Sequence, residues 1–378
     1  MKVGKIKGIE INLHLSVLII VGLVGYYAAN IYYSITGIFS IVDFIIVGII
    51  NGLIILGSIV AHELMHSIVS LQYGLNVSSI DLYLFGGVSN IEEEPKTPKS
   101  EMKISVVGPG ISLLIGAIFL SVYYIPVYLL KIDLPSQLTI TLVYSGLTNI
   151  ILGLFNLIPA FPMDGGRILR AYIWKRRDNL ISATETASNI GYYFGWVMVG
   201  GGLIELVFLP GLFSGIWLIV LGFFLSSSSR RALQQTIREY KLSKINAKEI
   251  QNVPSIEIPH NTTVSEAIRD FFMKYKNDYF PVVKNDEIVG IITINHLKNL
   301  PFKKRSNITI EEIMGKISTF PSVNEDQTVK IAFNKLQKQE EEPKFVIVKA
   351  DGKITGFIGL NEIQSTLRLS ELLLKDKI

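Results

Sequence analysis

Three ionisable side chains interrupt an apolar stretch in the pattern His62-Glu63-Leu64-Met65-His66. If this stretch is helical, residues i and i+4 share one face, so the two imidazoles can bind one metal ion. Glu63 stands beside them, where a carboxylate can take a proton from water whose pKa a metal lowers to about 7. A chance match is the alternative, but charged groups in an apolar span are costly and usually pair or coordinate. The pattern therefore predicts a hydrolytic metal site.

A catalytic zinc ion usually takes three protein ligands, and Asp164 is the best candidate for the third. It lies in the segment NLIPAFPMDGG, which begins at Asn156 and contains helix-ending prolines and glycines that permit close backbone approach. For Asp164 the alternative role is a turn residue at a helix end. Asn156 can donate a hydrogen bond to developing oxyanion charge, with helix-to-helix hydrogen bonding as its alternative role. We predict that His62, His66 and Asp164 bind the metal.

The chain has no cysteine and five histidines, so a metal site must use His, Asp and Glu. His14 opens the first apolar stretch and is interpreted as an interfacial anchor. His260 and His296 fall far along the chain and are not expected to bind the metal. Gly108-Pro109-Gly110 indicates close helix packing or a kink, without chemistry of its own.

The 378 residues are 49% hydrophobic and 18% charged, with a mean hydropathy of +0.41, too apolar for an ordinary soluble protein. Charged residues are dense only after Arg230. We expect a membrane domain at residues 1–229, a linker helix at 230–250 and a soluble tail at 251–378. Six stretches are long enough for a hydrocarbon core of about 30 Å: 11–33, 38–71, 104–130, 138–158, 187–209 and 212–226.

Basic residues set the expected orientation in the membrane. The connections on the N-terminal side of the membrane hold nearly all the basic residues, whereas the opposite side offers only Lys131. We therefore expect the N-terminus, the metal-binding motifs and the tail to face the cytosol of a cell membrane. Membrane orientation also accounts for the formal charge of +4, so nucleic-acid binding is not expected.

Between the second and third stretches, residues 77–91 have strand-like composition, a Gly86-Gly87 break and no helical period. A short β-hairpin is the prediction, with an ordinary surface loop as the alternative. Non-helical backbone at membrane depth is tolerated only where protein or a wet cavity satisfies its polar groups.

The tail contains a repeat, because the run VSEAI from Val264 is echoed by VKIAF from Val329. Two strand-like runs follow each copy, at residues 279–283 and 288–293 and then at 345–349 and 354–358. The tail is therefore predicted to hold two α/β units.

Taken together, HELMH and NLIPAFPMDGG, with VVGPG and FGGV between them, resemble the site-2 protease family of intramembrane zinc metalloproteases over residues 1–230. The resemblance implies an endopeptidase in the lipid bilayer that cleaves transmembrane helices of regulatory membrane proteins. The implied fold is a polytopic α-helical membrane protein of six transmembrane helices with a hairpin-like insertion. The implied roles are zinc ligation by His62, His66 and Asp164, general base catalysis by Glu63, and a position near the substrate carbonyl for Asn156.

The tail resembles a tandem pair of cystathionine beta-synthase (CBS) domains, at residues 251–304 and 309–370, which often bind adenine nucleotides. In the first unit Thr293 fits the phosphate-contacting pattern, but His296 stands where an acidic ribose contact is expected. In the second unit the hydroxyl residue is missing, although Glu362 can replace the acid. The resemblance implies regulation by an adenine nucleotide, with a purely dimerising module that gives a homodimer as the alternative.

A CBS-regulated channel or transporter with a structural metal site is the competing interpretation, since such proteins also combine membrane spans with this tail. They need a polar permeation path, whereas the intramembrane charges here cluster as metal ligands near one face. We therefore expect an enzyme whose substrate helix unwinds before cleavage, because helical carbonyls are already hydrogen-bonded.

Overall fold

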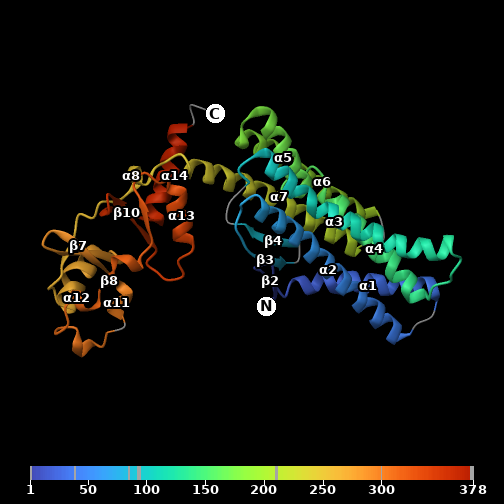
Figure 1. The fold of residues 1–378 in the computed structure, drawn as a ribbon, viewed down its shortest axis with the longest axis horizontal. Coiled ribbons are helices and arrows are strands. Elements are labelled where there is room, and N and C mark those ends of the chain that lie inside the picture. Colours follow the sequence, from blue (N-terminus) through green and yellow to red (C-terminus); the bar gives the residue numbers. More distant parts are fainter. Residues whose placement is uncertain are drawn as a thin grey trace. The chain divides into compact units, whose positions relative to one another are not determined.

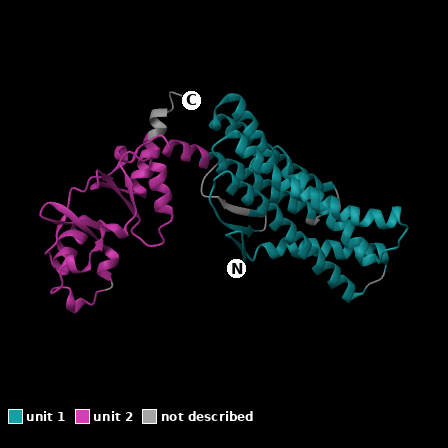
Figure 2. Ribbon diagram, viewed as in Figure 1, with its two compact units in different colours: residues 1–234 teal, residues 235–378 magenta. Residues whose placement is uncertain are grey.

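The computed structural model describes residues 2–37, 40–83, 86–91, 95–208, 212–298 and 300–374. The chain divides into two compact units, residues 1–234 and 235–378 (Figure 2). The division falls inside helix α7, and each unit has its own core.

Among the described residues, six helices are long and apolar enough to cross a membrane, in agreement with the six predicted spans. Many of their large apolar side chains point outward, including Ile49, Ile151 and Val197. Such exposure suits lipid as the surrounding solvent. The helices, labelled in Figure 1, are α1 (Val17–Thr36), α2 (Ile41–Gln72), α3 (Pro98–Tyr124, continued by a π-turn at Ile125–Leu129), α4 (Ser136–Asn156), α6 (Leu180–Phe208) and α7 (Leu212–Leu242).

Two features of unit 1 differ from the expectation. A short helix, α5 (Asp164–Arg177), follows the NLIPAFPMDGG segment, with Asp164 as its first residue. The first span begins at Val17 rather than at residue 11, because residues 9–13 form a strand instead.

The predicted hairpin is confirmed as two antiparallel strands, β3 (Val77–Tyr83) and β4 (Gly86–Ile91), whose turn at residues 84 and 85 lies outside the described residues. It belongs to a larger sheet of order β1-β2-β3-β4, completed by β1 (Lys2–Ile6) and β2 (Ile9–Leu13). Strand β2 runs parallel to β3. The apolar side of this sheet packs on α2 through Leu56, Ile59, Val60 and Leu64, so it lies against the helix that carries HELMH.

Unit 2 contains two small sheets, as the repeat predicts. The first has the order β5-β6-β7-β8 and the second the order β11-β10-β9. The strands are β5 (Ile258–Pro259), β6 (Tyr279–Lys284), β7 (Glu287–Thr293), β8 (Gly315–Lys316), β9 (Ser322–Asn324), β10 (Phe345–Ala350) and β11 (Lys353–Gly359). The helices are α8 (Ala247–Ile250), α9 (Val264–Glu266), a π-turn (Ala267–Phe272), α10 (Met273–Tyr275), α11 (Ile294–Lys298), α12 (Ile310–Ile313), α13 (Val329–Gln337) and α14 (Leu360–Leu374), with 3-10 turns at Phe302–Lys304 and Ile317–Thr319.

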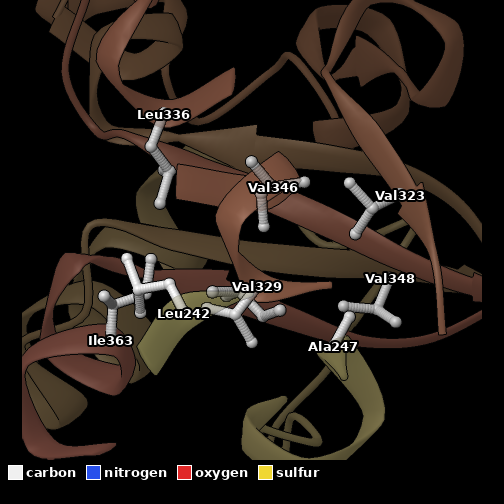
Figure 3. Close-up of a cluster of buried hydrophobic side chains, with 10 residues drawn as sticks. Leu242, Ala247, Val323, Val329, Leu336, Val346, Val348 and Ile363 are labelled. Carbon is white, nitrogen blue, oxygen red and sulfur yellow. The ribbon is translucent and has the colours of Figure 1, made fainter. Parts of the chain in front are cut away.

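The expected linker at 230–250 takes part in regular structure and in the core of unit 2. Helix α7 continues to Leu242, whose side chain is fully buried with Val346 and Ile363 (Figure 3). Ala247 lies in the same cluster. The apolar burial of these two residues ties the end of α7 to the second sheet.

An aromatic cluster joins the two sheets of unit 2. The ring of Tyr279 stacks on that of Phe345 at a centroid distance of 4.2 Å, and Phe357 packs edge-on to Phe345. Burial and the nearby Glu362 carboxylate raise the pKa of the Tyr279 hydroxyl, so it stays protonated.

Candidate metal centre

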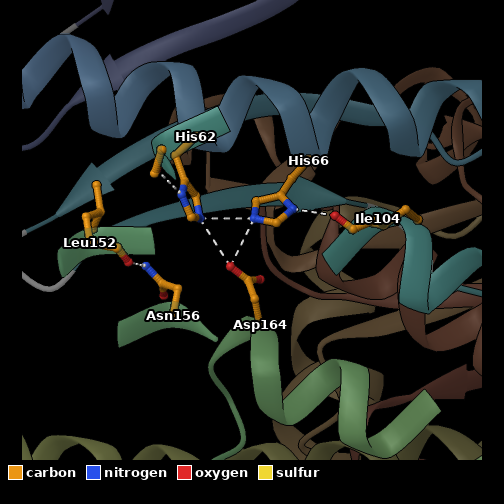
Figure 4. A network of polar contacts seen from close by, with 7 residues as sticks. His62, His66, Ile104, Leu152, Asn156 and Asp164 are labelled. Atoms are coloured by element: carbon orange, nitrogen blue, oxygen red, sulfur yellow. Dashed lines mark hydrogen bonds and ion pairs between the residues drawn. The ribbon is translucent and has the colours of Figure 1, made fainter. Parts of the chain in front are cut away.

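Two histidines of one helix and an aspartate about a hundred residues later in the sequence converge in unit 1 (Figure 4). Nε2 of His62 and Nε2 of His66 are 3.2 Å apart, and Oδ2 of Asp164 lies 3.1 Å from the first and 3.2 Å from the second. The two histidines are one turn apart on α2, and Asp164 opens α5. All three are at most 9% exposed. The structure thus brings together the three residues that the sequence suggested as ligands.

The size of this triangle fits a zinc ion. Bonds of about 2.0–2.1 Å in a tetrahedral site place neighbouring ligand atoms about 3.3–3.4 Å apart. The three observed separations of 3.1–3.2 Å are close to that edge length. Two imidazole nitrogens and one carboxylate oxygen are also donors that zinc accepts, and they leave a fourth position open. Among the described residues, this is the His/Asp/Glu group close enough to share an ion.

Helix α3 contacts both imidazoles at Nδ1, the ring nitrogen that does not face the candidate metal position. Nδ1 of His66 lies 2.6 Å from the backbone carbonyl of Ile104. A carbonyl only accepts, so Nδ1 must carry the proton, and the lone pair of a neutral ring is then on Nε2. Nδ1 of His62 lies 2.9 Å from the hydroxyl of Ser112, which is fully buried. Contacts of this kind fix ring orientation at metal sites.

Gly108, on the same face of α3, makes room for the two ring nitrogens. A Cβ atom built on it would lie 2.2 Å from Nε2 of His66 and 2.7 Å from Nε2 of His62. A side chain there would occupy the space beside the two Nε2 atoms that could hold a metal. The expectation that Gly108-Pro109-Gly110 has only a packing role therefore misses the closeness of Gly108 to the two Nε2 atoms.

Two glycines allow Asp164 to reach this position. A Cβ on Gly165 would lie 2.1 Å from the carbonyl oxygen of Leu157, and one on Gly166 would lie 2.2 Å from the nitrogen of Phe161. The loop before α5 therefore folds directly onto the first turn of the helix. This confirms the close backbone approach that the sequence predicted from these glycines.

The side chain of Glu63 lies beside strand β4. A Cβ on Gly87 would lie 2.2 Å from Cγ of Glu63 and 2.6 Å from its Cδ. The glycine thus lets the β-sheet approach the carboxyl group that follows His62. Gly87, which the sequence suggested only as part of a break, allows this close approach.

The other candidates in unit 1 have local partners. The Asn156 side-chain amide donates to the carbonyl of Leu152, one turn earlier in its own helix, at 3.0 Å (Figure 4). The ring of His14 packs against Tyr83 and its Nδ1 lies 2.9 Å from the Ser16 hydroxyl. His14 is exposed at the start of α1, in keeping with an anchor.

Two of the three candidate nucleotide contacts, His296 and Glu362, occupy equivalent places in the two repeats, and Gly359 stands in the place of Thr293. The Thr293 backbone N–H donates to Nδ1 of His296 at 3.1 Å, and the Gly359 backbone N–H donates to Oε2 of Glu362 at 2.9 Å. Each pair joins the end of a strand to the helix that follows. Burial lowers the pKa of His296, opposed by the charge of Glu341, so this acceptor imidazole is neutral near pH 7.

Comparison with known proteins shows similarity along nearly the whole chain. The family model of peptidase family M50 matches residues 49–136 and 126–201, and that of the CBS domain matches residues 247–302. The zinc metalloprotease MJ0392 of Methanocaldococcus jannaschii is 32% identical over 370 residues, covering 97% of this chain and 96% of that protein. The solved structure of a site-2 protease from the same organism is 30% identical and covers 61% of this chain and 94% of that one, with a TM-score of 0.41.

Proposed function

Because the chain belongs to peptidase family M50, the zinc metalloproteases of the site-2 protease type, and carries a CBS domain, we propose that His62, His66 and Asp164 hold its zinc ion. The observation that carries this proposal is the convergence of their three ligand atoms within 3.2 Å of one another. Membership of this family also replaces the channel or transporter interpretation with that of an intramembrane protease.

Bound zinc supplies Lewis-acid chemistry, since it polarises a peptide carbonyl and lowers the pKa of water. Glu63 accepts the proton of the attacking water and passes it to the nitrogen of the departing amine. The Ile104 carbonyl and the Ser112 hydroxyl hold the two imidazoles in place while charge develops. Asn156 turns from its contact with Leu152 to donate to the carbonyl oxygen of the substrate.

The substrate in this proposal is a transmembrane helix of a regulatory membrane protein that unwinds near the metal centre. Strand β4 is the last strand of its sheet and lies beside Glu63. An extended peptide that pairs with its outer edge would present its backbone to Glu63 and to the metal ligands. Substitutions that block pairing at β4 should therefore slow cleavage of helical substrates.

The central test compares wild type with Glu63→Gln in detergent, using a labelled transmembrane-helix substrate and measuring bound zinc in both proteins. We expect Glu63→Gln to retain zinc and to lose cleavage, because the amide cannot accept the proton. A wild type that bound no zinc would overturn the ligand assignment. A Glu63→Gln variant that cleaved at the wild-type rate would overturn the role of Glu63.

The CBS unit is proposed to modulate cleavage by binding an adenine nucleotide near Thr293, His296 or Glu362, with a homodimer through this unit as the alternative role. Modulation requires different nucleotide affinities in the more and less active states. Calorimetric titration of the full chain with ATP, ADP and AMP, alongside cleavage rates, tests this directly. Absence of both heat and thermal shift would leave the dimer as the proposed role, checked by its mass in solution.

The proposed orientation places the N-terminus and the tail in the cytosol. Since the natural chain has no cysteine, single cysteines can report accessibility without background. In intact cells, an impermeant maleimide should label Lys131→Cys but neither Lys7→Cys nor Lys244→Cys. The reverse labelling pattern would invert the topology.

A further inference from the structure

A buried ion pair joins α3 to α5 beside the metal centre. Nε and Nη2 of Arg170 lie 2.6 Å and 2.5 Å from Oε1 of Glu101. Glu101 is 1% exposed and Arg170 is 4% exposed. Arg170 belongs to one of the connections whose basic residues set the expected orientation in the membrane, yet its side chain is buried. Burying two charges is costly unless their geometry is precise, so the pair calls for a specific role.

Arg170 contacts the segment before Asp164 and belongs to the helix that begins at Asp164. Its guanidinium lies over the ring of Phe161, 4.8 Å from the ring centroid, and Phe161 precedes Asp164 by three residues. Arg170 itself belongs to α5, the helix that Asp164 opens. The Phe161 carbonyl, in addition, accepts a hydrogen bond from the hydroxyl of Ser229 at 2.5 Å. The segment that contains Asp164 is thus fixed from outside on either side of the carboxylate.

Glu101 ties this segment to the helix that orients the histidines. Residues 101, 104, 108 and 112 of α3 are three or four apart and so lie along one face. The Ile104 carbonyl and the Ser112 hydroxyl orient the two imidazoles, whereas Glu101 forms an ion pair with Arg170 of α5. A single face of α3 therefore contacts the elements that carry all three ligand atoms.

We propose that Glu101 and Arg170 are a positioning pair that sets the distance of the Asp164 carboxylate from the two imidazoles. This inference rests on the proposed role of Asp164 as a zinc ligand. Neither residue belongs to the three-residue group that could hold the metal. Loss of the pair lets α5 shift against α3, and a ligand triangle with edges of 3.1–3.2 Å tolerates little displacement.

The test measures how fast zinc leaves the full-length, zinc-loaded protein in detergent when a chromophoric chelator is added. We expect Glu101→Gln to release zinc about 10- to 100-fold faster than wild type, as with the loss of other supporting contacts around metal ligands. Arg170→Lys keeps the charge but loses the planar fork, so it should show a smaller increase in the same direction. Exchanging the two residues, Glu101→Arg with Arg170→Glu, should restore part of the retention.

Asp43→Asn is the matched control. Asp43 accepts hydrogen bonds from Gln137 at 3.2 Å and Tyr32 at 3.4 Å, and so also joins different helices. It lies 19 residues before His62 on α2, about 28 Å along the helix. Zinc release should be unchanged in this variant, whereas a general loosening of the membrane domain would affect it as well.

The melting temperature of the zinc-free proteins separates positioning from stability. Folded Glu101→Gln and Arg170→Lys variants that release zinc at the wild-type rate would overturn the proposal. So would failure of both single variants and of the exchanged pair to fold, because the pair would then serve the fold itself. Asp164→Asn, with Glu101 and Arg170 intact, tests the ligand role of Asp164 separately from the positioning role of the pair. If this variant retains zinc as wild type does, the ligand assignment itself is wrong.

Discussion

The hydroxyl of Ser112 lies 2.9 Å from Nδ1 of His62, although 50 residues separate them in the chain. Removing this hydroxyl should leave the orientation of the His62 ring less restricted. Helix α3 should not be disturbed, because alanine favours helix. We expect Ser112→Ala to lower zinc affinity about tenfold, measured by competition with a chelator of known affinity. Ser58→Ala is the control, since the Ser58 hydroxyl bonds only to the Ile54 carbonyl of its own helix among the described contacts. Equal affinities for the two variants would contradict the role of Ser112.

A methyl group at position 108 should exclude zinc. The added Cβ of Gly108→Ala would lie 2.2 Å from Nε2 of His66, much closer than nonbonded atoms approach. We expect zinc content to fall to background, with the helical circular dichroism unchanged. Gly110→Ala changes the same motif where the added Cβ has no neighbour within 4 Å, so it should retain zinc. Full zinc loading of Gly108→Ala would show that the rings can move aside.

A methyl group at position 87 should affect catalysis and spare the metal. In Gly87→Ala the added Cβ would lie 2.2 Å from Cγ of Glu63, so the carboxyl group must move. Cleavage of a model helix should fall about 100-fold, the lower range for losing a positioned general base, while bound zinc stays at the wild-type level. The matched control is Gly57→Ala on α2, where the added Cβ meets nothing within 4 Å. Unchanged cleavage by Gly87→Ala would show that the close approach of β4 does not position Glu63 for catalysis.

The two CBS repeats allow a gain-of-binding prediction. His296 accepts the Thr293 N–H in the way that Glu362 accepts the Gly359 N–H, so an acid is compatible with the local geometry. His296→Asp should strengthen adenine-nucleotide binding about tenfold, because a carboxylate accepts hydrogen bonds from ribose hydroxyls more strongly than a neutral imidazole does. Calorimetry on the full chain measures the change. An unaltered affinity would argue against a nucleotide at the first repeat.

Those parts of the structure that depend on local patterns could be predicted from the sequence. His62 and His66 are four residues apart on a helix, and this spacing alone predicts a shared face. Asp164 was predicted to lie near them from its motif and from the alternation of spans, and the structure brings its carboxylate to the two imidazoles. The strands after Val264 and Val329 were predicted by their composition and by the repeat.

The contacts around the candidate ligands could not be predicted in this way. The hydrogen-bond acceptor for His66 is a backbone carbonyl, which every residue type has and no sequence pattern marks. Gly108 matters because it has no side chain to clash with the imidazoles. Glu101 and Arg170 are 69 residues apart, so no local spacing reveals the pair. Strand β2 was missed because its alternating residues merge with the apolar stretch that begins α1.

The two imidazoles differ in how readily a mutation removes their hydrogen-bond partners. The His62 ring contacts a side-chain hydroxyl that a single substitution such as Ser112→Ala removes. His66 depends on the Ile104 carbonyl, which every amino acid at that position would supply while α3 remains helical. Among related enzymes, the partner of the first histidine should therefore vary in chemical type. The partner of the second can persist through complete turnover of the side chain at its position.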